Sequence, residues 1–173
     1  MPLQSALMST GSHDATVRWE RGAHAFVDNR YGRAHVWVFD GGAEVPASAS
    51  PANVPRGAAD PSAVDPEEGF IAALASCHML WFLSIAAGRG LVVDRYEDRA
   101  VGYIMPLADA PGREVLGRVV LRPAVTFAAS STCSEAELAA LHEEANRHCF
   151  LANALGPSCC LFIEPGAPFV APR

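Results

Sequence analysis

The chain has 173 residues, of which half are hydrophobic and 18% are charged, and its formal net charge is −6 at pH 7. This length and composition are enough for one compact domain with a sizeable core. A nucleic-acid partner is not expected, because such polyanions are bound by clustered Lys and Arg, and this acidic chain has no basic run.

The N-terminus is expected to be a short tail and not a signal peptide. Residues 1–10 lack a positively charged start followed by an apolar stretch, so we expect a soluble cytoplasmic protein. Its five cysteines are an odd number without disulfide-framework spacing, and in a reducing compartment they are expected to be free unless one pair has a redox role. One domain is predicted over 15–165, between tails at 1–14 and 166–173.

The first third of the chain predicts strands. Short β-prone runs separated by glycine-containing turns are typical of an antiparallel meander. The runs are Ala15 to Glu20, Ala23 to Asn29, Ala34 to Asp40 and Ala43 to Ala47. The segment from Pro46 to Asp65 is rich in Pro, Ala, Ser and Gly, which predicts an irregular connection.

A long helix begins at the clearest start signal in the sequence. Asp65 can cap it, Pro66 suits the first helical position, and Glu67 and Glu68 favour the positive end of the helix dipole. The helix is expected to run to Gly88, which is roughly 23 residues or about 35 Å. Because it is apolar nearly all round, it must be covered by protein or by lipid.

The lipid alternative rests on 70–87, which carries no formal charge and is about long enough to span a bilayer. Against it stand Ser76, His78 and Ser84 within the segment, and the absence of an aromatic belt or a lysine-rich flank in the sequence. We therefore expect no membrane and predict a central helix covered by sheet and by a second subunit.

The remaining elements complete an α+β fold with two sheets around the long helix. Two strands are predicted at Val92 to Met105 and at Glu114 to Thr126. A second helix begins at Ser134, where Glu137 completes a capping box, and is expected to end before Gly156. A final strand is predicted from 158 to 164.

Two cysteines lie on the inward faces of the predicted helices, Cys77 on the first and Cys149 on the second. A buried free cysteine is most simply a small hydrophobe, and that account also serves the other three cysteines, Cys133, Cys159 and Cys160. Glu67 precedes Cys77 by ten residues, some 15 Å along the helix, so it cannot touch that sulfur. It could hold an arginine that does, because a guanidinium can bridge a carboxylate and a thiolate.

Two stretches of the sequence resemble one known family. Asp65-Pro66-Glu67-Glu68 followed by Ala72-Ala73-Leu74-Ala75-Ser76-Cys77, together with the late helical cysteine of Cys149-Phe150-Leu151, resembles the osmotically inducible protein C and organic hydroperoxide resistance (OsmC/Ohr) family. The proline and serine that follow the second cysteine in that family are absent here. The order of strands, linker and helices also matches over most of Ala15 to Glu164.

The resemblance implies an intertwined homodimer and a peroxidase that needs no cofactor and no metal. It implies Cys77 as the peroxide-attacking thiolate, Cys149 as the thiol that closes a disulfide with it, and Glu67 as the holder of an arginine. The arginine is Arg33, in a Gly-Arg turn, with Arg56 as the substitute. An arginine there would lower the pKa of Cys77.

In the implied cycle, attack on a hydroperoxide leaves a sulfenic acid at Cys77, which condenses with Cys149. An external dithiol, a lipoyl protein by resemblance, then reopens the disulfide. Apolar residues near both cysteines favour an organic hydroperoxide over hydrogen peroxide, and they serve core packing equally well. These residues are Phe70, Leu74, Trp81, Phe82 and Phe150.

Three other interpretations stay open. The pairs Cys77-His78 and His148-Cys149 supply a common zinc ligand set, but neighbours on a helix diverge by about 100°, which disfavours one metal collecting both pairs. Cys77 with His148 or His78 could form a cysteine hydrolase or thioesterase. A non-catalytic protein that binds an apolar ligand is the third.

Overall fold

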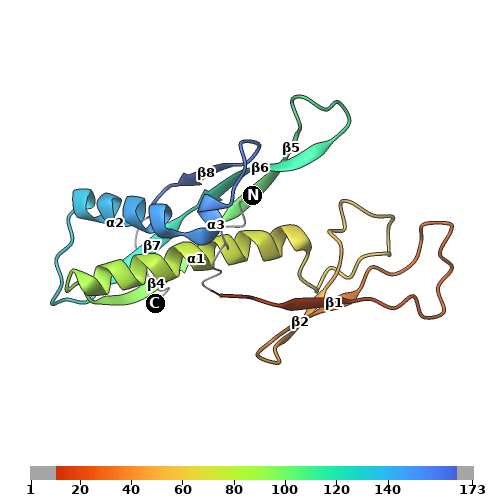
Figure 1. The fold of residues 1–173 in the computed structure, drawn as a ribbon, viewed down its shortest axis with the longest axis horizontal. Coiled ribbons are helices and arrows are strands. Elements are labelled where there is room, and N and C mark those ends of the chain that lie inside the picture. Colours follow the sequence, from red (N-terminus) through yellow and green to blue (C-terminus); the bar gives the residue numbers. More distant parts are fainter. Residues whose placement is uncertain (1–10, 167–173) are drawn as a thin grey trace, which may run out of the picture. The chain divides into compact units, whose positions relative to one another are not determined.

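The computed structural model describes residues 11–166 (Figure 1). Its contacts divide the chain into two compact units, Met1–Pro66 and Glu67–Arg173, and each unit is described by itself. The predicted tails at 1–14 and 166–173 lie largely outside the described residues.

The N-terminal unit is a three-stranded antiparallel sheet in the order β1-β2-β3, which confirms the predicted meander. Its strands are β1 (Ala15–Arg18), β2 (His35–Phe39) and β3 (Glu44–Ala47). The prediction of a strand from Ala23 to Asn29 is wrong. Gly22 and Asn29 have φ of 60° and 61°, and these left-handed positions make turns in place of a ladder. The connection after β3 is irregular, as expected, apart from a bridge between Ala47 and Val64.

The helix α1 (Pro66–Gly88) has the predicted bounds. Its fully buried residues are Leu74, His78, Phe82 and Ala86, which follow a four-residue spacing and therefore form one stripe along the helix. The rest of the helix is partly or fully exposed in the single chain, where only 22% of its most apolar stretch is buried. By length and composition alone this helix could cross a membrane.

The two long strands predicted after α1 are each divided in two. The first forms β4 (Val93–Asp98) and β5 (Val101–Pro106), and the second forms β6 (Glu114–Leu121) and β7 (Pro123–Phe127). At the corner, Asp98 Oδ1 accepts a hydrogen bond of 2.6 Å from the backbone N–H of Arg122. This side-chain bond replaces the backbone ladder, and Pro123 has no N–H to continue it. The chain therefore switches sheets there, with β4 pairing β7 and β5 pairing β6.

The strands of the whole described chain form three hydrogen-bonded sheets, not the two expected. The pairs of named strands are antiparallel, as predicted, except that β8 (Cys160–Ile163) runs parallel to β6. A parallel neighbour follows because the whole second helical segment crosses over between the two strands. The fold is otherwise the predicted α+β arrangement with a long central helix.

The second long helix begins as predicted and ends earlier. Ser134 caps α2 (Glu135–His148), with both hydrogen bonds of the capping box to Glu137 present. The helix was expected to continue to about residue 155, but it stops at Cys149, and a short turn, α3 (Phe150–Asn153), follows. Phe82 of α1 and Leu141 of α2 share one apolar cluster, so the two helices pack together (Figure 1).

Candidate dithiol site

Cys149 lies at the break between two helices. Its backbone is extended, with φ −67° and ψ 113°, and it is at once the C-cap of α2 and the N-cap of α3. The sulfur accepts a hydrogen bond from the N–H of Ala152 over 3.4 Å, so the thiol caps α3 as a serine hydroxyl would. This cap is the physical reason that the predicted continuous helix is interrupted at this residue.

Cys77 meets Cys149 in the core of the C-terminal unit. Cys149 is fully buried in a cluster with Leu74 and Val119, and Cys77 is half-buried against that cluster. The two thiols interact directly. Burial first, and then the interaction with Cys77, raise the pKa of Cys149 to about 11. The fold therefore brings together two cysteines that are 72 positions apart in the sequence.

An aromatic group stands beside the dithiol. Trp81, one helical turn after Cys77, packs against the same apolar cluster. Its ring stacks on His148 at 5.0 Å and meets Phe150 edge-on at 5.8 Å. Phe150 itself is 72% exposed, so the aromatic group extends from the buried sulfurs to the surface of the single chain.

The histidines considered above as zinc ligands or catalytic bases have other partners. His78 points to α2, where its Nε2 lies 3.0 Å from Nδ1 of His142, and His148 stacks on Trp81. Within residues 11–166 no three potential metal ligands gather. Cys77 and His78 thus face different neighbours, as their 100° separation on a helix requires.

Comparison with known proteins places the chain in a family. The model of the OsmC-like protein family matches residues 59–161. An OsmC-like protein of unknown function from Vibrio cholerae is 44% identical, with a TM-score of 0.82 over 88% of this chain and 99% of that chain. The chain belongs to the OsmC-like family. A search of curated proteins found no match.

More distant OsmC-like structures share the fold. An organic hydroperoxide resistance protein from Elizabethkingia anophelis is 15% identical, with a TM-score of 0.68 over 93% of this chain and 99% of that chain. An organic hydroperoxide resistance protein of Bacillus subtilis is 17% identical, with a TM-score of 0.64 over 90% and 98%. At these identities the likeness concerns the fold alone.

The other predicted residues of the OsmC-like site are distributed over both units. Glu67 lies half-buried in the first turn of α1. Arg33 belongs to the N-terminal unit, where its guanidinium stacks over the ring of Tyr31 at 3.7 Å. It donates to the backbone oxygens of Tyr31 and Asn29 and, over 2.7 Å, to Oδ1 of Asn29. Arg56 is exposed in the irregular connection.

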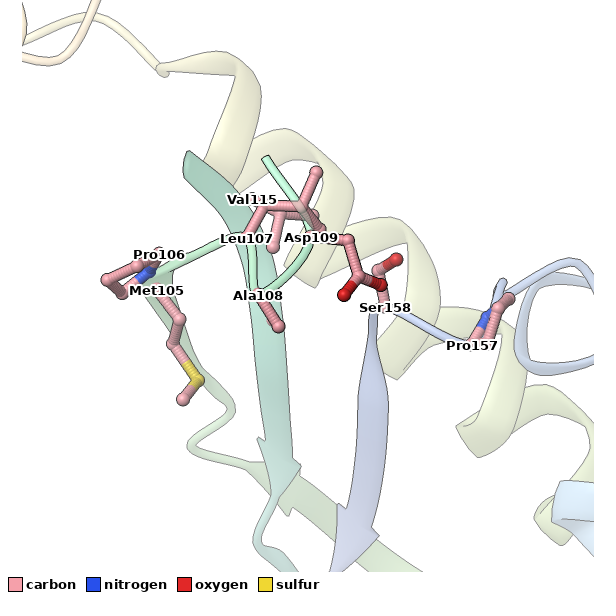
Figure 2. A pocket seen from close by; sticks show the side chains of 9 residues that line it. Met105, Pro106, Leu107, Ala108, Asp109, Val115, Pro157 and Ser158 are labelled. Carbon is pink, nitrogen blue, oxygen red and sulfur yellow. The ribbon is translucent and has the colours of Figure 1, made fainter. Parts of the chain in front are cut away.

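Arg33 stands at the edge of an aromatic hollow of about 390 Å³ in the N-terminal unit. Its lining includes the rings of Trp19, Phe26 and Tyr31, and the Trp19 and Phe26 rings lie 5.3 and 4.6 Å from that of Tyr31. A separate hollow of about 330 Å³ in the C-terminal unit is drawn in Figure 2. Its polar lining comes from Asp109 and Ser158, and neither cysteine of the dithiol lines it.

Sequence reasoning missed one residue of the C-terminal unit that contacts the site's helix, His142. Its signal was available, because His142 sits between Leu141 and Ala145 on the inward stripe of α2 that ends at Cys149. A histidine on an apolar stripe must find a polar partner in the core. That partner, His78, is 64 positions away, and no local pattern points to it.

Proposed function

We propose that this OsmC-like protein is a thiol peroxidase that reduces organic hydroperoxides, with Cys77 as the nucleophile and Cys149 as the resolving thiol. The observation that carries the proposal is the contact between these two thiols in the core. A peroxidase of this type needs a second sulfur within bonding reach of the first. Distant relatives of the same fold are organic hydroperoxide resistance proteins, which supports the same reaction class.

The cycle balances with one peroxide and one external dithiol. The thiolate of Cys77 attacks the peroxide, the O–O bond breaks, and the alkoxide leaves as an alcohol after taking up a proton. Cys77 becomes a sulfenic acid. Cys149 attacks that sulfur, the S–S bond forms, the S–O bond breaks and water leaves. The dithiol returns both cysteines to thiols and is itself oxidised to a disulfide, and a lipoyl protein is the proposed donor.

Activation of Cys77 is assigned to an arginine held by Glu67. Only the thiolate is a strong nucleophile, and a guanidinium nearby favours that form by its charge and its N–H donors. Arg33 is the first candidate. Within the described part of the chain, three of its five N–H groups are engaged with Tyr31 and Asn29, which leaves two donors. Arg56 is the substitute.

The substrate preference is drawn from the apolar surroundings of the thiols. Trp81 and Phe150 form an aromatic wall between the sulfurs and the surface, and such a wall would bury the hydrocarbon part of a hydroperoxide. Hydrogen peroxide has no such part. An organic hydroperoxide therefore gains binding energy that hydrogen peroxide does not.

A homodimer in the cytoplasm is part of the proposal. The exposed side of α1 carries Phe70 and Leu80, which are 43% and 61% exposed in the single chain, and unpartnered apolar side chains of this size are characteristic of a covered interface. A second copy of the chain is the proposed cover. The alternative cover, lipid, would require the dithiol to work within a membrane-spanning segment.

The test is peroxide treatment followed by peptide mapping. With cumene hydroperoxide the wild type should form a Cys77–Cys149 disulfide, Cys149→Ser should stop at one sulfenic acid, and Cys77→Ser should consume no peroxide. Cys160→Ser is the matched control, because Cys160 is exposed and outside the contact. No disulfide in the wild type would favour a non-catalytic binding protein. Thioester hydrolysis that survives Cys149→Ser but not Cys77→Ser would favour the hydrolase.

A further inference from the structure

A pair of neutral histidines joins the two helices that carry the thiols. Nε2 of His78 on α1 and Nδ1 of His142 on α2 are 3.0 Å apart, and the rings are nearly parallel, at 9°. His78 is completely buried and His142 is 3% exposed. Each lies on the same helix as one sulfur: His78 directly follows Cys77, and His142 lies seven residues before Cys149.

This pair of buried polar rings lowers the stability of the fold compared with apolar side chains in the same place. One N–H lies in the bond between the rings, so one of the outer nitrogens is a donor and the other an acceptor in either arrangement of the protons. Those outer atoms, Nδ1 of His78 and Nε2 of His142, are buried and have no hydrogen-bond partner among residues 11–166. Each such atom costs about 1–3 kcal/mol compared with an apolar side chain. Stability alone does not explain the pair.

The pair can fix the register of α1 against α2, that is, the rotation and the position along its axis at which one helix packs on the other. Helix α1 is apolar nearly all round, so hydrophobic burial scarcely distinguishes one rotation or one sliding position of α1 on α2 from another. A single buried polar contact makes that distinction, because every other register would leave both rings without a partner. Buried polar residues fix the register of coiled coils in the same way.

We propose that His78 and His142 are positioning residues: their hydrogen bond sets the register of α1 on α2 and thereby holds the sulfur of Cys77 against that of Cys149. The inference deepens the proposed function and rests on it for the use of the disulfide in a peroxidase cycle. The Arg89–Glu144 ion pair also joins the end of α1 to α2, but it is a weaker constraint because solvent screens these partly exposed groups.

The test measures how readily the two thiols form a disulfide without any peroxide. The reduced protein is equilibrated with mixtures of glutathione and glutathione disulfide, which gives the effective concentration of one thiol at the other. In the His78→Leu, His142→Leu double variant both rings are replaced, so the fold should be as stable as wild type or more so. The effective concentration should nevertheless fall by about tenfold or more, because the register is no longer specified.

Isosteric variants provide the rescue. Gln places an amide near the position of Nε2 of a histidine, and Asn places one near Nδ1, so His78→Gln and His142→Asn can each keep the interhelical bond. Both should stay within about threefold of the wild-type effective concentration. Should the double leucine variant fail to fold, His142→Leu is compared with His142→Asn in the same way. Leu141→Ala is the control for lost stability alone, and it should not lower the effective concentration.

The outcomes separate this inference from the proposed function. A folded double variant with the wild-type effective concentration would overturn the positioning role, as would a wild type in which glutathione disulfide never links Cys77 to Cys149. If that disulfide forms and depends on the histidines, but no peroxide is consumed, the positioning role stands and the peroxidase proposal fails.

Discussion

Cys149, fully buried at the end of α2, lies against Cys77, and this contact adds to burial in raising the pKa of its thiol. The contact gives the two cysteines unequal chemical properties. Cys149 is held in its protonated form, because burial and the contact with Cys77 raise its pKa to about 11, whereas Cys77 lies at the edge of the cluster and is half-buried. The arrangement suits a pair in which the accessible sulfur meets the substrate first.

Alkylation of the reduced native protein should show this inequality. At pH 7 a thiol of pKa about 11 has about a hundredfold less thiolate than one with the ordinary value of 9.0. Cys149 should therefore react with iodoacetamide at least about a hundredfold more slowly than the exposed Cys160, as followed by mass spectrometry of peptides. In urea the two rates should converge. Rapid native alkylation of Cys149 would contradict the buried, protonated state.

The stability of the protein should fall in mild acid because of the histidine pair. Burial lowers the pKa of His78 and of His142 to about 4, from 6.5. Between these values the unfolded chain binds protons that the folded chain does not, so stability is fully present above pH 6.5 and is lost as the pH falls towards 4. From pH 7.5 to 5.5 the free energy of unfolding should decrease by about 2–3 kcal/mol for the pair.

Urea denaturation at the two pH values measures this loss. The matched variant is His78→Leu, His142→Leu, which removes both rings and should flatten the dependence between pH 7.5 and 5.5. Carboxylates contribute little in that range, because their ordinary pKa values lie well below it. A wild-type urea midpoint that does not move between the two values would show that the rings are protonated or solvated in the folded state.

Local signals in the sequence predicted the helices well. Asp65 and Pro66 mark the start of α1, Gly88 its end, and the capping box of Ser134 and Glu137 marks the start of α2. These signals are short-range, since the groups that satisfy the first N–H donors of a helix lie within a few residues of it. The strands of the meander were found for the same reason, from alternation and from nearby turns.

Features set by distant partners were not predictable. The corner between β4 and β5 depends on the bond from Arg122 to Asp98, 24 residues apart. The early end of α2 was missed for a different reason: the cap of α3 is local, but cysteine is not among the residues that usually mark an N-cap. The residues of the site show the same difference between local signals and distant partners. Cys77 and Cys149 were named because their motif resembles a family, but the pairing of His78 with His142 depends on packing that no local pattern records.

An added methyl at Gly102 should strain the packing of β5 against α1. A Cβ there would lie 2.6 Å from Cδ1 of Ile71 and 2.8 Å from Cδ1 of Leu116, so these side chains must move. Gly102→Ala should therefore destabilise the protein by about 1–3 kcal/mol in urea unfolding. Gly156→Ala is the control, since a Cβ at Gly156 meets nothing within 4 Å. Equal stability of the two variants would contradict the packing of this helix on the sheet.

The exposed side of α1 gives a test of the proposed dimer. Leu80 is 61% exposed in the single chain, and if a second copy covers α1 this leucine becomes part of an apolar interface. Leu80→Glu would bury an unpaired carboxylate there, at a cost of several kcal/mol, so the variant should sediment as a monomer at micromolar concentration where the wild type is a dimer.

Val92→Glu is the matched control. Val92 is similarly exposed, at 52%, but it follows the end of the helix, so the Val92→Glu variant should remain a dimer. A monomeric wild type would refute the dimer, and partition of the wild type into detergent or lipid vesicles would show that lipid covers α1 instead. A Leu80→Glu variant that remains dimeric would place the interface on another surface.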